Sequence, residues 1–140
     1  MTDVIYLFDA SLVGFPEVRR RVAVGADQTL HDLHEGMRNA FGWADDHLYS
    51  FWLSGEFWAQ DGSEYTAPID LEEGQRSADV PVASLELEEG DRIAYVFDFG
   101  DEWRVEIGVA GSEPANAISY PTVVRSEGEA PPQYPDVEED

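Results

Sequence analysis

The 140-residue chain carries 30 Asp and Glu against 8 Lys and Arg, which gives a formal net charge of −22, and it has no Cys. This length fits one domain with a real hydrophobic core, and the lack of Cys excludes disulfides, thiol nucleophiles and iron–sulfur clusters. A hydrophobic content of 43% argues against a disordered acidic chain. No apolar run is long enough to span a membrane, and the start lacks the basic flank of a signal peptide. We therefore expect a cytoplasmic protein without a membrane partner.

The excess of carboxylates predicts adaptation to high salt. All eight basic residues are Arg, so Lys is absent. For a folded sphere of this charge compared with the unfolded coil, the screened Coulomb repulsion is on the order of 15 kcal/mol at 0.1 M salt and a third of that at 1 M. Folded domains are stable by only about 5–15 kcal/mol. We expect a halophilic protein that unfolds when salt is removed, with an acidic mimic of DNA as an alternative explanation of the charge.

The beginning of the chain predicts two antiparallel strands. Apolar residues alternate over residues 3–12 and 18–24, and a Gly-Phe-Pro break separates the two segments. Arg19, Arg20 and Arg21 form a basic cluster in the second strand, but side chains on a strand point alternately to its two faces. The cluster therefore cannot form one flat phosphate patch. We expect it to guard a sheet edge or form ion pairs, and we do not expect nucleic acid as a partner.

A single amphipathic helix is predicted next. Apolar side chains recur at helical spacing over residues 30–41, with Thr29 placed to cap the helix and Gly42 to end it in the left-handed conformation. His31 and His34 lie off the apolar stripe, and their spacing could suit a metal. Because acidic residues flank both, we expect solvated or ion-paired imidazoles instead.

The rest of the chain predicts further strands and one long excursion. Three more segments carry the apolar or alternating pattern of strands: 47–53, 92–99 and 103–109. Residues 60–84 lack periodicity and are expected to be loop, with a helical turn at 82–85. Pro, Ser and Glu increase after Gly111, so we expect one domain over residues 1–128 and an irregular acidic tail over 129–140.

Three motifs together resemble one known family. They are residues 29–43, which end in Phe-Gly-Trp, residues 46–51, and residues 95–103, which end in Asp-Phe-Gly-Asp-Glu-Trp. Their order and spacing resemble the plasmid pRiA4b ORF-3-like family, also filed as transposon passengers under a resolvase-type name. The resemblance implies an α+β fold in which a curved, mainly antiparallel sheet packs against one principal helix. It implies no established activity, and the resolvase label does not carry over because no Ser here lies among the Arg residues that a serine recombinase needs.

The strongest candidate site is the tip of the hairpin formed by the last two predicted strands. Carboxylates on a tight turn could bind a divalent cation, or they could simply accept hydrogen bonds from the turn amides. If a cleft opens between the helix and the sheet, we expect five residues near its mouth: His47, Tyr49, Asp98, Asp101 and Trp103. No glycine-rich phosphate loop and no Ser nucleophile elbow is present, so we assign no catalytic residue, no metal and no cofactor.

The sequence favours a non-catalytic module that binds a protein or a small molecule and is associated with mobile genetic elements. We leave enzymatic activity open and favour its absence. The main alternative is a small metal-assisted hydrolase that uses His47 with the hairpin carboxylates.

Overall fold

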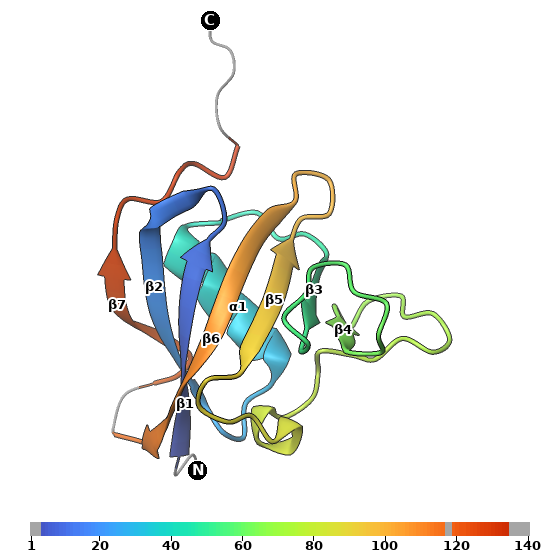
Figure 1. Ribbon diagram of the computed structural model, residues 1–140, viewed down its shortest axis with the longest axis horizontal. Helices are drawn as coiled ribbons and strands as arrows, with labels where there is room; N and C mark the ends of the chain where they lie inside the picture. Colours follow the sequence, from blue (N-terminus) through green and yellow to red (C-terminus); the bar gives the residue numbers. More distant parts are fainter. Residues whose placement is uncertain (1–3, 117–118, 135–140) are drawn as a thin grey trace, which may run out of the picture.

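The computed structural model describes residues 4–116 and 119–134, which form one curved antiparallel sheet with a single α-helix (Figure 1). The strands are β1 (Val4–Leu12), β2 (Phe15–Gly25), β3 (Tyr49–Trp52), β4 (Glu64–Thr66), β5 (Arg92–Phe97), β6 (Trp103–Pro114) and β7 (Thr122–Glu127). The helix α1 spans Leu30–Phe41, and a short 3₁₀ helix, η1, spans Val82–Leu85. The order across the sheet is β4-β3-β5-β6-β1-β2-β7.

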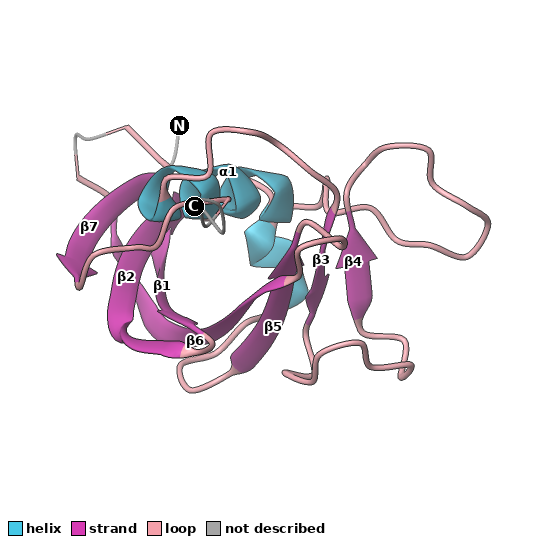
Figure 2. Ribbon diagram, turned by 90° about the horizontal axis from the view of Figure 1, so that it is seen from above, coloured by secondary structure: helices cyan, strands magenta, loops and turns pink. Residues whose placement is uncertain are grey.

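The α+β class expected above is wrong, because the described chain is dominated by its sheet. Seven strands accompany one α-helix of 12 residues. The sheet curves into an open arc, and the one helix crosses its concave side (Figure 2). Most residues of the main core cluster lie on the strands. The sequence underestimated the sheet because β4 and β7 lie in segments without a clear alternating pattern.

Strand pairing confirms the two hairpins expected from the sequence. β1 pairs with β2 on one side and with β6 on the other. β5 and β6 pair from Arg92 opposite Gly108 to Phe97 opposite Trp103. β6 continues past the predicted end at residue 109, and β3 is shorter than the predicted 47–53.

The basic cluster on β2 does not guard a sheet edge. β7 pairs with β2, so the edge strands are β7 and β4. Arg21 forms the expected ion pair, with its Nε 2.6 Å from Asp9 Oδ1. Arg20 points to the other face, where it is 8% exposed and donates to the carbonyls of Ala40 and Glu127.

The helix begins and ends where the sequence predicts. The Thr29 hydroxyl accepts from the Asp32 amide at 3.1 Å, and the Asp32 carboxylate accepts from the Thr29 amide at 2.9 Å. This reciprocal capping box satisfies two amides that the first turn leaves unpaired. Gly42 ends the helix with φ of 78°, a conformation that costs glycine little.

The Phe-Gly-Trp motif connects the helix to the β5–β6 hairpin. After the turn at Gly42, the Trp43 ring stacks on Phe97 with centroids 4.7 Å apart. Trp43 also lies 5.0 Å from the Phe41 ring and 5.8 Å from the Trp103 ring. Offset aromatic pairs of this kind stabilise beyond the area they bury. Two motifs distant in sequence thus form one aromatic stack in the core.

The predicted tail is only partly described. Residues 129–134 contain no strand or helix, and residues 135–140 lie outside the described residues. Gln133 is 8% exposed and forms two hydrogen bonds with the backbone of Asp45, so this segment lies against the loop that follows α1. Within the described ranges, no helix is long and apolar enough to cross a membrane.

Candidate functional site

The tip of the β5–β6 hairpin, residues 98–102, lies at the same end of the molecule as the β1–β2 turn and the start of the C-terminal segment (Figure 1). Asp98 shapes the turn. Its Oδ1 accepts from the amides of Gly100 and Asp101 at 3.1 and 3.3 Å, and its own φ is 66°. Asp tolerates the left-handed region better than most residues because its side chain can bond locally. The turn-amide role considered for these carboxylates is therefore present at Asp98.

His47 joins the hairpin tip to the C-terminal segment. Its Nε2 lies 3.5 Å from Asp98 Oδ2 and 2.8 Å from the Tyr134 hydroxyl. The His47 ring also meets the Phe97 ring edge to face at 5.8 Å. Of the predicted site residues, His47 and Asp98 are thus in contact, and Tyr134 is a partner that the sequence did not indicate.

A groove of about 550 Å³ opens beside this cluster. Its lining combines apolar and charged side chains: Val13, Phe15, Asp101, Glu102, Trp103, Arg104 and Tyr134. The Phe15 and Trp103 rings lie 6.2 Å apart. Trp103 is 9% exposed, and its indole N–H has no hydrogen-bond partner among the described residues. Asp101 and Trp103 therefore line one concave surface, but residues of α1 are not part of its lining, so it is not the cleft between helix and sheet that was expected.

Acidic side chains at the rim of the groove differ in their partners. Glu102 accepts from the Arg104 Nε at 2.6 Å, and this hydrogen bond lowers the pKa of Glu102. Glu102 also accepts from the Trp58 indole at 3.2 Å. The Glu102 charge is therefore balanced locally by Arg104, whereas Asp101 is exposed.

Tyr49 does not join the hairpin tip, so this part of the predicted site is separate. It is 1% exposed, and its hydroxyl lies 2.7 Å from His31 Nδ1. Its ring stacks on His34 with centroids 3.7 Å apart. Tyr49 belongs to a second polar cluster, between α1 and the sheet.

His34 is the centre of this second cluster. It is fully buried, so of the two alternatives expected the solvated imidazole is wrong for His34, whereas pairing with a carboxylate is present, with Asp46 for His34 and with Glu35 for His31. Its Nδ1 lies 2.7 Å from the Tyr95 hydroxyl, and its Nε2 lies 2.9 Å from Asp46 Oδ1. Because a carboxylate can only accept, Nε2 carries the ring proton, and the Tyr95 hydroxyl donates to Nδ1. Both ring nitrogens are satisfied inside the core.

Burial controls the electrostatics of this cluster. It lowers the pKa of His34 to about 4, against the opposing effect of the Asp46 carboxylate. Burial also raises the pKa of Tyr49 and of Tyr95. For Asp46, partial burial acts to raise the pKa, but the hydrogen bond from His34 and nearby charges lower it overall. The cluster therefore holds a neutral imidazole and an ionised carboxylate at neutral pH.

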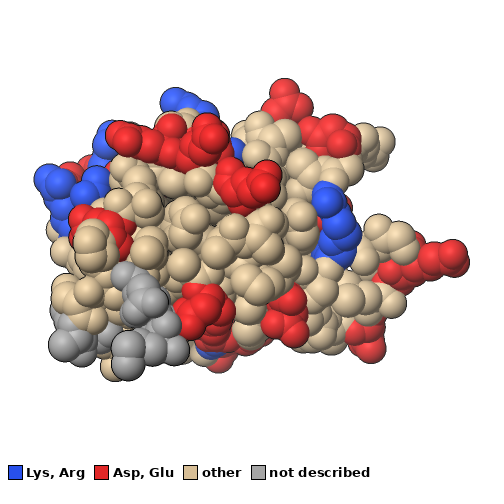
Figure 3. Space-filling view, turned by 90° about the horizontal axis from the view of Figure 1, so that it is seen from below, with Lys and Arg blue, Asp and Glu red and all other residues tan. Residues whose placement is uncertain are grey.

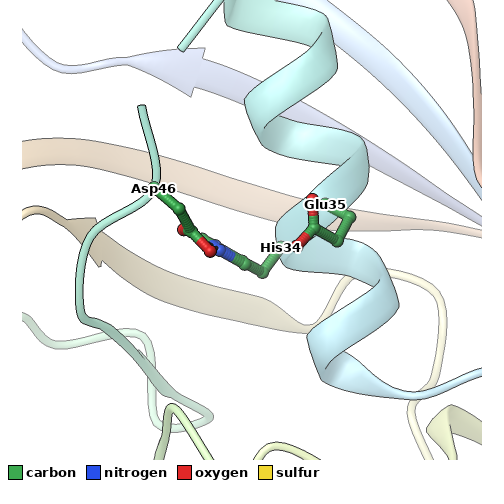
Figure 4. A group of neighbouring side chains, drawn as sticks. All are labelled: His34, Glu35 and Asp46. Carbon is green, nitrogen blue, oxygen red and sulfur yellow. Dashed lines mark hydrogen bonds and ion pairs between the residues drawn. The ribbon is translucent and has the colours of Figure 1, made fainter. Parts of the chain in front are cut away.

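Two elements bring metal-ligating side chains together in this second cluster (Figure 4). Ligand atoms of His34 and Glu35 on α1 and of Asp46 in the following loop all lie within 4.8 Å of one another. In residues 4–116 and 119–134 this is the one such group of three, and His47 with the hairpin carboxylates does not form another.

The sequence carried a partial signal for the second cluster. The i, i+3 spacing of His31 and His34 was visible, and Asp46 is part of the 46–51 motif. No local pattern indicated that Tyr95, 61 positions further along the chain, would bond to His34. Tyr134 and Gln133 likewise contact residues 87 and 88 positions away, in a Pro-rich segment without periodicity.

Comparisons with known proteins agree with this architecture. The family model described as plasmid pRiA4b ORF-3-like protein matches residues 5–138. Uncharacterized protein y4hQ of Sinorhizobium fredii (strain NBRC 101917 / NGR234) is 31% identical over 120 residues, which are 84% of this chain and 59% of that protein. The crystal structure of the protein of unknown function MM3350 from Methanosarcina mazei Go1 is similar with a TM-score of 0.75 at 23% identity, covering 95% of this chain and 74% of that one.

The fold is that of a curved antiparallel-sheet protein with one crossing helix and polar clusters at two places. The chain belongs to the plasmid pRiA4b ORF-3-like family, which confirms the resemblance drawn from the three motifs. It spans 59% of the length of y4hQ, and the likeness to the Methanosarcina protein concerns the fold alone.

Proposed function

We propose that this protein is a non-catalytic binding module, and that the groove at the hairpin tip takes a positively charged segment of a partner protein with an aromatic anchor. The observation that carries the proposal is the composition of the groove: an aromatic floor made by Phe15 and Trp103 beside the exposed carboxylate of Asp101. Aromatic surfaces of this kind supply most of the binding energy in interfaces, and acidic rims select the partner by its charge.

The charge of the whole molecule supports a cationic partner. The formal net charge is −22, so a basic segment meets fewer like charges than an acidic one would; in high salt this preference acts only at contact distance, because the Debye length is about 3 Å at 1 M. At the groove itself Arg104 balances Glu102, and Asp101 is the exposed carboxylate on the hairpin turn. An Arg side chain of the partner could pair with Asp101 while a neighbouring aromatic ring packs on Phe15.

The alternative of a metal-assisted hydrolase has less support. His47 and Asp98 lie 3.5 Å apart, but Asp98 already accepts two turn amides, and His47 contacts the Tyr134 hydroxyl. Within the described residues no third His or carboxylate converges with them. The DNA-mimic alternative does not use the groove.

The cellular location of the module and its association with mobile elements are also proposals. We place it in the cytoplasm, adapted to high salt and associated with mobile genetic elements, with no role for nucleic acid or membrane as a partner. The basis is the acidic composition and the family to which the chain belongs.

A peptide titration tests the groove. The probe is a short peptide with one Phe flanked by Arg, and calorimetry at about 1 M KCl suppresses non-specific attraction. Replacement of Asp101 by Arg places a repulsive charge at the rim, and we expect the Kd to rise at least about tenfold. The matched control is Glu73→Arg, the same charge change at an exposed position of the 67–81 loop, which should leave the Kd unchanged. Equal losses in both variants, or no binding of the peptide by the unaltered protein, would contradict the proposal.

A further inference from the structure

We propose that His34, Glu35 and Asp46 form a binding site for a divalent transition metal ion of the zinc type, separate from the hairpin groove. The ligand atoms of these three residues already lie within 4.8 Å of one another. Figure 4 shows the His34 ring directed at Asp46, with Glu35 to one side, and a modest inward rotation of the two carboxylates would bring all three groups to the bond lengths of about 2.0–2.2 Å that a shared ion requires. Three protein ligands with a position left for water are typical of accessible zinc sites.

The scaffold holds the three side chains on packed structure. His34 and Glu35 are consecutive on α1, and His34 is fully buried between the helix and the sheet. Asp46 lies on the loop that follows, and Arg38 fixes this loop by donating to the carbonyls of Trp43 and Ala44 at 3.2 and 2.6 Å. Metal sites need this kind of rigid support because ligand distances tolerate little variation.

The buried imidazole is oriented as a metal ligand would be. Tyr95 bonds to Nδ1 at 2.7 Å, which leaves Nε2 directed at Asp46. In metal-binding histidines the other ring nitrogen commonly donates a hydrogen bond, so Nδ1 and the Tyr95 hydroxyl would exchange their donor and acceptor roles. Binding at Nε2 moves the ring proton to Nδ1, which then donates a hydrogen bond to the Tyr95 hydroxyl oxygen, while the hydroxyl hydrogen turns away from the ring. The ring stays neutral throughout, so no net proton is needed.

An ion can reach the site from solvent. The side chains of Glu35 and Asp46 are 41% and 47% exposed, so the carboxylates form an open rim above the buried nitrogen. His31 lies beside this rim, with its Nε2 3.6 Å from Glu35 Oε2, and is the nearest further imidazole. The site thus combines a buried ligand with accessible ones.

Arg38 supplies the positive charge between the two carboxylates. Its Nη1 lies 2.9 Å from Glu35 Oε1, and its Nε lies 3.7 Å from Asp46 Oδ1. A divalent ion would replace these two contacts, while the bonds from Arg38 to the loop carbonyls remain. An imidazole ligand favours Zn²⁺, Co²⁺ or Ni²⁺ over Mg²⁺ and Ca²⁺, which prefer oxygen ligands only.

Zinc titration by calorimetry tests the site in about 1 M KCl, where the many surface carboxylates bind ions weakly. We expect one Zn²⁺ per chain, with a Kd that rises at least about tenfold in Glu35→Gln and in Asp46→Asn. Both substitutions are at exposed carboxylates, and near-ultraviolet circular dichroism checks that the variants keep the fold. Glu72→Gln, an exposed carboxylate on the 67–81 loop, is the matched control and should bind as the unaltered protein does.

Nitrogen-15 spectra of the histidine rings provide the second readout. Without metal, His34 should carry its proton on Nε2, and saturating Zn²⁺ should move that proton to Nδ1. Loss of affinity in Glu72→Gln equal to that in the site variants would overturn the proposal. So would an unchanged His34 tautomer at saturation, or the absence of a site tighter than the carboxylate background.

Discussion

At the scale of single residues, His34 is a buried imidazole that depends on two specific hydrogen-bond partners. A fully buried imidazole is stable only if both of its ring nitrogens find partners, because a buried polar atom without one is costly. Tyr95 and Asp46 supply these partners. The arrangement accounts for the buried Tyr95 hydroxyl and the position of Asp46, whether or not an ion binds.

Removing the Tyr95 hydroxyl tests how much the hydrogen bond to His34 Nδ1 contributes to stability. In Tyr95→Phe the Nδ1 atom of His34 loses its donor in the core, and we expect the free energy of unfolding to fall by about 1–3 kcal/mol. Urea denaturation in high KCl measures the change. Tyr65→Phe is the control. The Tyr65 hydroxyl accepts a hydrogen bond from Arg76 Nη1 at 3.2 Å, and this contact is exposed, so its loss should change the free energy of unfolding little. Equal costs in the two variants would contradict the buried network.

The depressed pKa of His34 predicts a pH dependence of stability. The pKa is about 4 in the folded protein, against 6.5 for an unperturbed histidine. Between pH 6.5 and 4 the imidazole of His34 is therefore protonated in the unfolded chain but neutral in the folded protein. The contribution of the neutral imidazole to the free energy of unfolding is complete above pH 6.5 and is lost as pH falls toward 4. Between pH 7.5 and 5 this loss is about 2 kcal/mol.

Ring titration by nuclear magnetic resonance separates this effect from the carboxylates. The His34 ring should remain neutral at about pH 5, well below the range in which an exposed histidine gains its proton. A His34 ring that titrates near 6.5 would show that burial does not control its charge.

At the scale of elements, the close approach of α1 to the sheet depends on Gly36. A Cβ atom added there would lie 2.9 Å from Val22 Cγ1 and 3.2 Å from Pro121 Cβ. The helix therefore rests on β2 and on the residues that lead into β7, with no space for a side chain at this point. This contact explains a glycine in the middle of a helix, where its propensity is unfavourable.

Gly36→Ala separates packing from helix propensity. Propensity alone would stabilise the helix by about 1 kcal/mol, whereas the added methyl forces the helix away from β2. We expect packing to prevail and the free energy of unfolding to fall by about 1–2 kcal/mol. Asn39→Ala, at an exposed position of the same helix, should instead stabilise slightly. Thermal denaturation compares the two variants, and a higher midpoint in Gly36→Ala would mean that the contact is not tight.

Local chemistry explains which elements the sequence could predict. The capping box at Thr29, the end of the helix at Gly42 and the β5–β6 hairpin follow from side-chain types within a few residues. β4 pairs through three residues only, and β7 is mostly exposed, so neither shows the alternation on which a sequence prediction depends. Both are edge strands, so their pairing with β3 and β2 depends on residues far away in the chain.

The candidate site divides in the same way. The sequence predicted His47, Asp98 and Trp103 together because Asp98 and Trp103 belong to one hairpin. In the structure, His47 contacts Asp98. Tyr49 was grouped with them because residues 47 and 49 would lie on one face of a strand. The strand begins only at Tyr49, however, and the Tyr49 ring stacks on His34 in the core. Contacts made across 61 or 87 positions leave no mark on local sequence.

At the scale of the whole molecule, charge is the dominant feature. In the view of Figure 3, Asp and Glu side chains occupy several separate groups over the surface. Arg21, Arg38 and Arg104 each pair with a carboxylate, but eight basic residues cannot balance thirty acidic ones. Most of the negative charge therefore depends on dissolved cations for its screening.

This predicts a strong response of stability to salt. We expect the melting temperature to rise steeply between about 0.1 M and 3 M KCl, because screening weakens the repulsion within the folded state. Calorimetry in KCl and in an equal ionic strength of NaCl distinguishes general screening from a specific ion. A melting temperature that does not change over this range would contradict adaptation to high salt.

Binding of a cationic, aromatic segment in the hairpin groove can be followed through the indole signals of the four Trp residues. Trp103 lines the groove, whereas Trp52 packs in a separate buried cluster; neither indole N–H has a partner among the described residues. On addition of the Arg-flanked Phe peptide, the Trp103 indole resonance should shift while that of Trp52 stays in place. Binding that leaves Trp103 unmoved, or that shifts both resonances alike, would contradict binding in the hairpin groove.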